Sequence, residues 1–233
     1  MSALPPPLVV ATAILTTSVV YLGAEELARR VRTPLLNPVL VAILVLVGLL
    51  RGLEIDYATY AQGGKVLAFF LGPAVVALGV SVHENLTALG ARARAMAFAC
   101  AVGGVLGVVV AAGIARSFGA DRALTATLAP KSVTSPIAME IAAHTGGFPA
   151  LAAAIVVAVG VFGSVVGPPL LRLLGVRDPV AWGLAMGAAA HGVGTARAAE
   201  EGERQGAASA LAMGLMGVVT AIAAPLVVSL LFP

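Results

Sequence analysis

The chain has 233 residues, of which 60% are apolar and only 11% are charged, and its mean hydropathy is +1.02. Water-soluble domains are about 25% charged, so this composition predicts a protein embedded in a lipid bilayer. The net charge of +3 is small and dispersed, which excludes a nucleic-acid surface. The single Cys100 excludes an internal disulfide framework and a cysteine metal cluster, and we expect neither a metal nor a cofactor.

Six apolar stretches are candidates for helices that cross the hydrocarbon core, which requires about 20 helical residues. The second stretch comes near this length if its helix begins at Leu35, with Pro38 in the first turn, where helices accept proline. The first stretch lacks the segment order of a cleavable signal peptide, so we expect it to be retained as a span. The six stretches are residues 8–22, 38–50, 66–82, 95–118, 150–174 and 207–232.

Basic residues cluster after the first and third stretches and predict the orientation of the chain. Arg29, Arg30 and Arg32 follow the first stretch, and Arg92 and Arg94 follow the third. Cytoplasmic loops of membrane proteins carry an excess of lysine and arginine. We therefore expect both loops in the cytoplasm and the amino terminus outside.

Two further stretches, 121–144 and 178–204, are apolar helical patterns that are interrupted in the middle. The interruptions are 130–136, which has proline at both ends, and 191–195, which contains two glycines. Each arm has about ten residues, or about 15 Å of helix, which is half the thickness of the hydrocarbon. The breaks should lie near the midplane, where irregular backbone is tolerated only if it is buried in protein or lines a wet cavity.

The segment 129–212 contains a duplication in which residues recur sixty positions later. It brings polar and ionisable residues into an apolar chain, which is typical of secondary transporters with internal repeats. We expect an amino-terminal bundle, 1–118, and a duplicated transport core, 119–233. The halves of this core are 119–176 and 177–233. The repeated residues are Ala129, Lys131, Ser135, Ala138, Glu140, Gly146 and 150–152, matched by Ala189, His191, Thr195, Ala198, Glu200, Gly206 and 210–212.

The interrupted stretches could cross the membrane as broken helices or return to their own side as re-entrant hairpins. The excess of basic residues in cytoplasmic loops favours hairpins. If the first hairpin enters and leaves from outside, the next span runs inward and places Arg172 and Arg177 in the cytoplasm. A hairpin plus one span crosses an odd number of times, so the two copies would be inverted and their tips would meet. The predicted fold is an all-α polytopic membrane protein with about six full spans and two broken or re-entrant helices in an inverted repeat.

The first break has the residues that start a helix and attract an anion. Ser132, Thr134 and Ser135 are good N-cap types, and Pro136 suits the first helical position. The free N–H groups and positive dipole end of such a half-helix form an anion site, to which Lys131 adds a full charge.

The second break can approach a ligand with its backbone. Gly192 and Gly194 allow close approach, Thr195 can cap the following half-helix, and Arg197 lies in its first turn. Two half-helix N-termini would then converge, and a small carboxylate is the simplest ligand for two such ends and a lysine.

Each ionisable residue of the two breaks could have a structural role instead of a functional one. Lys131 could snorkel to an interface, although a midplane lysine is functional by default. His191 could be a packing residue, but its ordinary pKa near neutrality suits a coupling proton, and it occupies the repeat position of Lys131. Glu140 and Glu200 are either further proton-coupling carboxylates or interfacial charges.

Four segments carry a resemblance to a known family: LGPAVVALGVSV from Leu71, PKSVTSPIAMEIA from Pro130, GGFPAL from Gly146 and HGVGTARAAEEGE from His191. With these motifs and the final span, nearly the whole chain resembles the LrgB/CidB family of bacterial membrane proteins, whose plant relatives exchange glycolate and glycerate. The segment 81–84 departs from the family pattern, as does Gly192, where a larger residue is common.

The resemblance implies a carrier of small carboxylates such as glycolate, glycerate or pyruvate in the bacterial inner membrane, working with a separate small LrgA-like membrane protein. Older descriptions of the family imply instead a holin- or antiholin-like regulator of murein hydrolase export and cell lysis. A carrier needs Lys131 and His191, whereas a regulator would tolerate their loss; the buried polar breaks favour the carrier. We expect no enzyme, because no span has a nucleophile-elbow, metal or phosphate-loop motif. The expected partners are the carboxylate, the bilayer, the LrgA-like protein and, in a homo-oligomer, further copies of the chain.

Overall fold

Within the part of the chain that it describes, the computed structural model is helical and contains no β-strand. The described residues are 5–31, 36, 38–70, 73 and 91–233.

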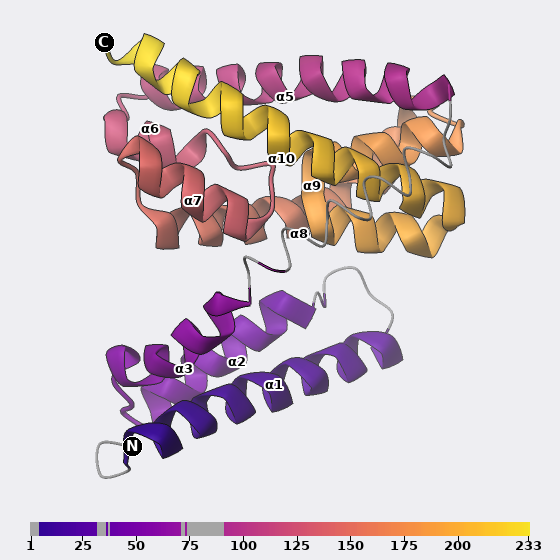
Figure 1. Ribbon diagram of the computed structural model, residues 1–233. Coiled ribbons are helices and arrows are strands. Elements are labelled where there is room, and N and C mark those ends of the chain that lie inside the picture. The colour runs from indigo at the N-terminus through magenta and orange to yellow at the C-terminus, as the bar shows by residue number, and fades with distance from the viewer. Residues whose placement is uncertain (1–4, 32–35, 37, 71–72, 74–90) are drawn as a thin grey trace. The chain divides into compact units, whose positions relative to one another are not determined.

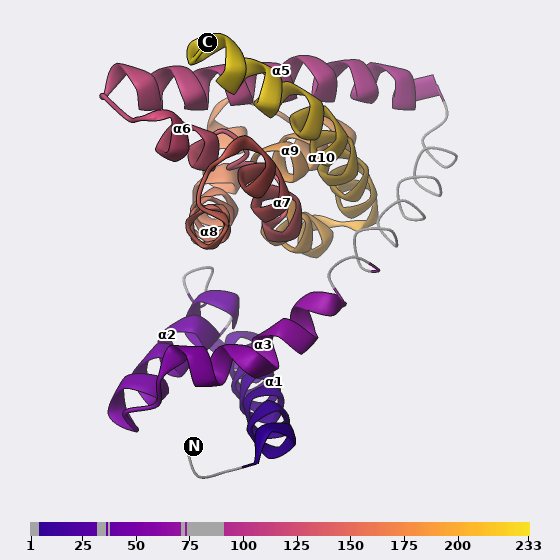
Figure 2. The ribbon, with the colours of Figure 1, turned by 60° about the vertical axis from the view of Figure 1, so that its left-hand side comes forward.

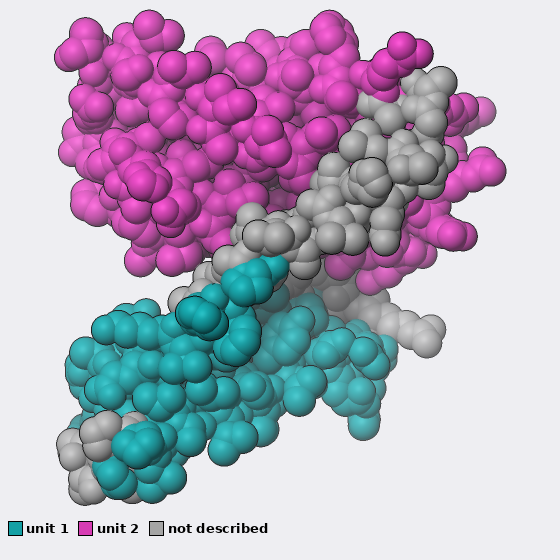
Figure 3. Space-filling model, viewed as in Figure 1, with its two compact units in different colours: residues 1–74 teal, residues 75–233 magenta. Residues whose placement is uncertain are grey.

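The helices belong to two compact units, residues 1–74 and 75–233 (Figure 3). In the first unit α2 and α3 pack against α1, and a hydrogen bond of 2.7 Å joins Thr17 Oγ1 of α1 to Tyr60 Oη of α3 (Figure 1). The helices are α1 (Pro6–Val31), α2 (Pro38–Gly52), α3 (Tyr57–Phe69), α5 (Ala91–Ser117), α6 (Arg122–Leu128), α7 (Ser135–Thr145), α8 (Pro149–Leu173), α9 (Pro179–Glu201) and α10 (Glu203–Leu231).

Among the described residues, four helices, α1, α5, α8 and α10, are long and apolar enough to cross a membrane. They confirm four of the six spans that the sequence predicts, and α2 is a shorter apolar helix of 15 residues. The predicted span 66–82 lies mostly outside the described residues, as do the motif that begins at Leu71 and the segment 81–84. The protein is therefore an all-α polytopic membrane protein.

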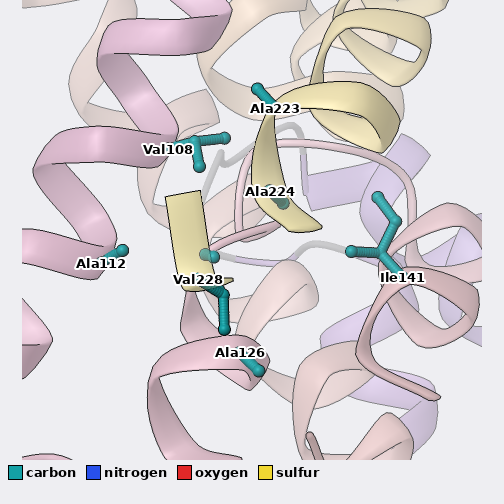
Figure 4. Packing of buried hydrophobic residues seen from close by; sticks show 8 residues of the cluster. Val108, Ala112, Ala126, Ile141, Ala223, Ala224 and Val228 are labelled. Atoms are coloured by element: carbon teal, nitrogen blue, oxygen red, sulfur yellow. The ribbon is translucent and has the colours of Figure 1, made fainter. Parts of the chain in front are cut away.

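In the second unit α5 packs along α10 and shares a buried cluster with it (Figure 4). Val108 and Ala112 of α5 meet Val228 of α10, Ala126 of α6 and Ile141 of α7 in this cluster. The compact unit thus includes α5, whereas the sequence places a boundary after residue 118. A helix that is apolar on all sides gives no pattern from which its neighbours could be predicted.

The first interrupted stretch folds into a hairpin of α6 and α7. Asp121 Oδ1 accepts a hydrogen bond of 2.8 Å from the amide of Leu124 and caps α6, while α7 ends at Gly146 with a φ of 81°, which glycine adopts readily. The amide of Phe148, just after α7, donates to Thr127 Oγ1 of α6 over 2.8 Å. The chain therefore returns to the helix from which it started and does not continue as a crossing helix.

The second interrupted stretch, α9, folds back at a kink. Ala190 (φ −128°, ψ 16°) and His191 (φ 42°, ψ −130°) leave the helical conformation. Trp182 and Met186 on the first arm share a buried cluster with Ala198 on the second. In a straight helix Trp182 and Ala198 would lie about 24 Å apart along the axis, so the two arms lie side by side.

The two hairpins have their bases at opposite ends of α8, a helix of 25 residues and about 38 Å. The first hairpin leads directly into the N-terminus of α8, and the second follows its C-terminus. α10 begins beside the second hairpin and ends beside α6, where Val228 shares a cluster with Ala126 (Figures 1 and 2). This is the opposed arrangement that the odd number of crossings in the repeat predicts.

Cysteine labelling can test whether the two bases face opposite sides of the membrane. In a Cys100→Ala background, His144→Cys and Glu203→Cys each place a thiol at an exposed position, at the base of the first and of the second hairpin respectively. An impermeant maleimide should label position 144 from outside and position 203 only after permeabilisation.

Cys100 is the single cysteine of the chain and is buried. The Cys100→Ala protein has no thiol and therefore controls for labelling of other groups. Labelling of both positions from one common side would contradict the opposed arrangement.

Candidate functional site

The tip of the first hairpin is the irregular segment between α6 and α7. Pro130 and Val133 of this tip are buried, and Val133 belongs to the same cluster as Val156, the eighth of the 25 residues of α8. Lys131 is half-buried, and its Nζ donates to Ser132 Oγ over 2.9 Å. Among the described residues no carboxylate lies within ion-pair distance of Lys131. The tip therefore holds a cation that no described residue neutralises.

The N-terminus of α7 adds polar groups beside this cation. Thr134, one of the three predicted N-cap types, is the N-cap, and Ser135 is the first helical residue, so Pro136 lies one position later than the sequence suggests. Thr134 makes no capping bond through its side chain, and its Oγ1 is buried without a hydrogen-bond partner among the described residues. Native proteins rarely leave a buried hydroxyl unpaired, because its desolvation costs about 1–3 kcal/mol. An anion at this helix start would pair Thr134 and face the positive end of α7.

The tip of the second hairpin is attached to α8 by a side chain. His191 is 5% exposed, and its Nε2 lies 2.9 Å from the backbone oxygen of Val156. A carbonyl oxygen can only accept, so Nε2 carries the proton and Nδ1 is the nitrogen with a free lone pair. The following Gly192 is exposed, and Gly194 is buried against the carbonyl of Met186.

Both tips converge on the same level of α8 and α10. On α8, Val133 of the first tip and His191 of the second both meet the region of Val156. On α10, a Cβ at Gly217 would lie 2.8 Å from Ile137 Cδ1, and a Cβ at Gly192 would lie 3.8 Å from Met213 Sδ. Positions 213 and 217 are about one helical turn apart. The two breaks are therefore neighbours, although sixty residues separate them in the sequence.

Thr195 has a different role from the predicted N-cap. The second arm of α9 resumes at Gly192, directly after the two non-helical residues, so Thr195 lies inside the arm. Its Oγ1 donates to the backbone oxygen of His191 over 2.9 Å and lies 3.0 Å from Ser209 Oγ of α10. The prediction was wrong because the break is shorter than the glycine-rich segment 191–195 suggests. Thr195 instead ties the second arm to α10.

The remaining charged candidates lie away from the tips. Arg197 pairs with Glu200 at 3.1 Å and Glu201 at 2.6 Å, and it lies about 9 Å along the arm from the break. Glu140 pairs with His144 at 3.0 Å, and the side chains of Glu140 and Glu200 are 74% and 70% exposed. The structure thus brings Lys131, Ser132, Thr134, Ser135, His191, Gly192 and Gly194 to the two tips, and places Arg197, Glu140 and Glu200 nearer the hairpin bases.

The base of the second hairpin has its own ionic contacts. Asp178 Oδ1 accepts a hydrogen bond of 2.9 Å from the amide of Ala181 and caps α9. This hydrogen bond holds the pKa of Asp178 below its ordinary value, and Arg92 of α5, 3.4 Å away, acts in the same direction. These contacts fix the start of α9 beside α5.

Sequence reasoning missed three residues that hold the second tip. Val156 contributes its backbone oxygen, which no side-chain pattern reveals. Gly160 lies next to the imidazole of His191, and Ser209 binds Thr195. A serine within the apolar stretch 207–232 was the one signal in the sequence.

Comparison with known proteins identifies the family of the chain. The model of the LrgB-like family matches residues 17–230, and the chain therefore belongs to this family. The chain is 35% identical over 213 residues to the uncharacterized protein YwbG of Bacillus subtilis, covering 91% of this chain and 95% of that protein. No solved structure matches the chain.

Two further relatives have descriptive names. The holin-like protein CidB of Staphylococcus epidermidis is 29% identical over 219 residues, which are 94% of this chain and 96% of that protein. The antiholin-like protein LrgB of Bacillus cereus is 31% identical over 192 residues, which are 82% of this chain and 84% of that protein. Similarity thus extends along almost the full length of these relatives.

Substitution of Thr195 tests the tie between the second hairpin and α10. Thr195→Val preserves the shape of the side chain but leaves Ser209 Oγ without this partner in a buried position. We expect the free energy of unfolding to fall by about 1–3 kcal/mol, measured by denaturation of the purified protein in detergent.

Thr195→Ser is the matched control, because it keeps the hydroxyl and should cost less than Thr195→Val. Equal stability of the valine variant and wild type would show that the hydrogen bond contributes nothing.

Proposed function

We propose that the chain is a secondary transporter, or the transport subunit of one, for small carboxylates such as glycolate, glycerate or pyruvate. The observation that carries this proposal is the convergence of the two half-helix N-termini, beside Lys131, at the level of Val156 on α8. Discontinuous helices in membrane transporters aim such N-termini at anionic groups of their substrates. Opposed hairpins can also expose one central site to each side in turn.

The energetics of the first tip favour a ligand of negative charge. A half-buried lysine that has no carboxylate partner in the described part of the chain is costly in an apolar setting, and an anion would compensate it. The hydroxyls of Ser132, Thr134 and Ser135 can each donate to a carboxylate oxygen. A small carboxylate matches this set of donors in charge and in number.

His191 is proposed to couple transport to protons. Its Nε2 is engaged with Val156, so the free Nδ1 would take the coupling proton when a carboxylate binds nearby. Substrate and proton would then bind cooperatively, each raising the affinity of the other. Glu140 and Glu200, exposed and paired near the hairpin bases, are the next candidates for coupling.

The proposed setting is the bacterial inner membrane, with the amino terminus outside. The proposed partner is a small LrgA-like membrane protein, and copies of the chain could associate into a homo-oligomer. A transport subunit without its partner would bind the carboxylate but require the second protein for flux.

A holin- or antiholin-like regulator of murein hydrolase export is the second candidate function, and the names of the CidB and LrgB relatives favour it. Such a regulator acts through lipid-facing or oligomer surfaces and does not need the paired tips. The two candidates differ in the effect of a tip substitution on cell lysis. Loss of Lys131 should alter lysis only if lysis depends on transport.

Lys131→Ala should abolish carboxylate binding, because it removes the charge that makes the first tip an anion site. Lys131→Arg should restore binding only in part, since the guanidinium is larger than an ammonium. Binding of labelled glycolate to the purified protein measures both effects.

The matched control is Lys65→Ala, which removes an exposed lysine from the first unit and should leave binding unchanged. Wild-type affinity in folded Lys131→Ala would remove the basis of the proposed anion site.

His191→Gln should keep glycolate binding but lose the response of uptake to pH. The glutamine amide can still donate to the oxygen of Val156, but it cannot take up a proton near neutrality. In proteoliposomes, wild-type uptake should rise as the external pH falls through about 6 to 7, the region of an ordinary histidine pKa.

An imposed pH gradient should drive accumulation by the wild type but not by His191→Gln. Accumulation with an unchanged pH profile in this variant would place the coupling elsewhere or make the protein a uniporter.

A further inference from the structure

The imidazole of His191 occupies space that a side chain on α8 would otherwise fill. A Cβ added at Gly160 would lie 2.6 Å from Cε1 and 2.7 Å from Nε2 of His191, which is closer than carbon atoms approach in proteins. Four residues earlier on the same face of α8, Val156 offers the oxygen that Nε2 binds. The helix therefore has both a hydrogen-bond acceptor and a gap for the imidazole ring.

His191 also has a backbone conformation that needs support. Its φ of 42° and ψ of −130° lie in a region that L-residues rarely adopt. Such conformations persist only where the surrounding structure holds them in place. The contact of the ring with α8 provides this support, so the kink of α9 and the position of the ring depend on each other.

We propose that Gly160 is the positioning residue for the second hairpin tip. Because Gly160 has no side chain, the ring of His191 can lie directly on α8 and bind Val156, and this contact sets where Gly192 and Gly194 present their amides. The effect on carboxylate affinity rests on the proposed function, whereas the position of the tip does not.

Another glycine of α8 provides a matched comparison. A Cβ at Gly167 would lie 2.6 Å from Met186 Sδ, and that atom is near the end of a flexible side chain that can move aside. At Gly160 the ring of His191 is held by its own hydrogen bond and by the kinked backbone. The same added methyl group should therefore displace the tip at position 160 and not at position 167.

A cysteine reporter at the tip tests the proposal without any substrate. Gly192 is exposed, and a Cβ there would meet Met213 Sδ at an ordinary 3.8 Å, so Gly192→Cys in a Cys100→Ala background should be tolerated. Adding Gly160→Ala should change the maleimide labelling rate of this thiol several-fold, and adding Gly167→Ala should not. In the absence of the reporter, Gly160→Ala should raise the half-saturating concentration of labelled glycolate, and Gly167→Ala should leave it unchanged.

A second substitution separates displacement of the ring from general damage. His191→Gly removes the ring and tolerates a positive φ, so Gly160→Ala should have no further effect on labelling in that background. If Gly160→Ala alone does not fold, His191→Gly should restore folding. Failure of this rescue would overturn the proposal, because the obstacle would then be Val193, whose Cγ2 would lie 3.0 Å from the new Cβ.

The remaining outcomes are also decisive. An unchanged labelling rate in folded Gly160→Ala, or an equal change in Gly167→Ala, would overturn the positioning role. A changed labelling rate in a protein whose wild type does not bind glycolate would support the positioning role and count against the proposed function.

Discussion

Backbone that leaves the helical conformation at the depth of the hydrocarbon has to find its hydrogen-bond partners inside the protein. The protein meets this requirement by folding each interrupted stretch back on itself and burying its tip against α8 near Val156. The hydrogen bond between His191 and Val156 and the burial of Val133 in the cluster of Val156 bring the two tips to one place. The site and the opposed arrangement of the hairpins both depend on this meeting point.

Small residues make such close packing possible. Gly163 lets Ala190 approach α8, and Gly183 and Gly187 let the first arm of α9 lie against backbone oxygens of α10. In lipid, helices gain little from hydrophobic exclusion and associate through close contact and hydrogen bonds. The second hairpin is therefore held by glycine contacts, by Thr195 and Ser209, and by the ring of His191. Val180 and Leu184 of its first arm also pack with Leu211 and Leu215 of α10.

Much of this architecture could be predicted from the sequence, because membranes limit the choices so strongly. Four spans and both breaks follow from apolar length and from helix-breaking residues, and the start of a helix within 132–136 follows from the N-cap residue types there. The contribution of Thr195 could not be predicted, since a threonine that follows glycines fits both an N-cap and the interior of a helix. The sequence also does not predict that α5 belongs to the second unit, because a helix that is apolar on all sides gives no pattern for its neighbours. Nor does it predict that Val156 accepts a hydrogen bond, because every residue has a backbone oxygen.

We propose that the two tips form one saturable site for a small carboxylate. The most direct test of this proposal is uptake of a panel of labelled carboxylates by proteoliposomes that contain the purified chain alone or together with an LrgA-like protein. The account predicts saturable uptake of glycolate or a similar small carboxylate in at least one of these conditions, and competition among members of the panel. Absence of saturable uptake in both conditions, from protein shown to be folded, would contradict it and favour the regulatory function that the names of the relatives suggest.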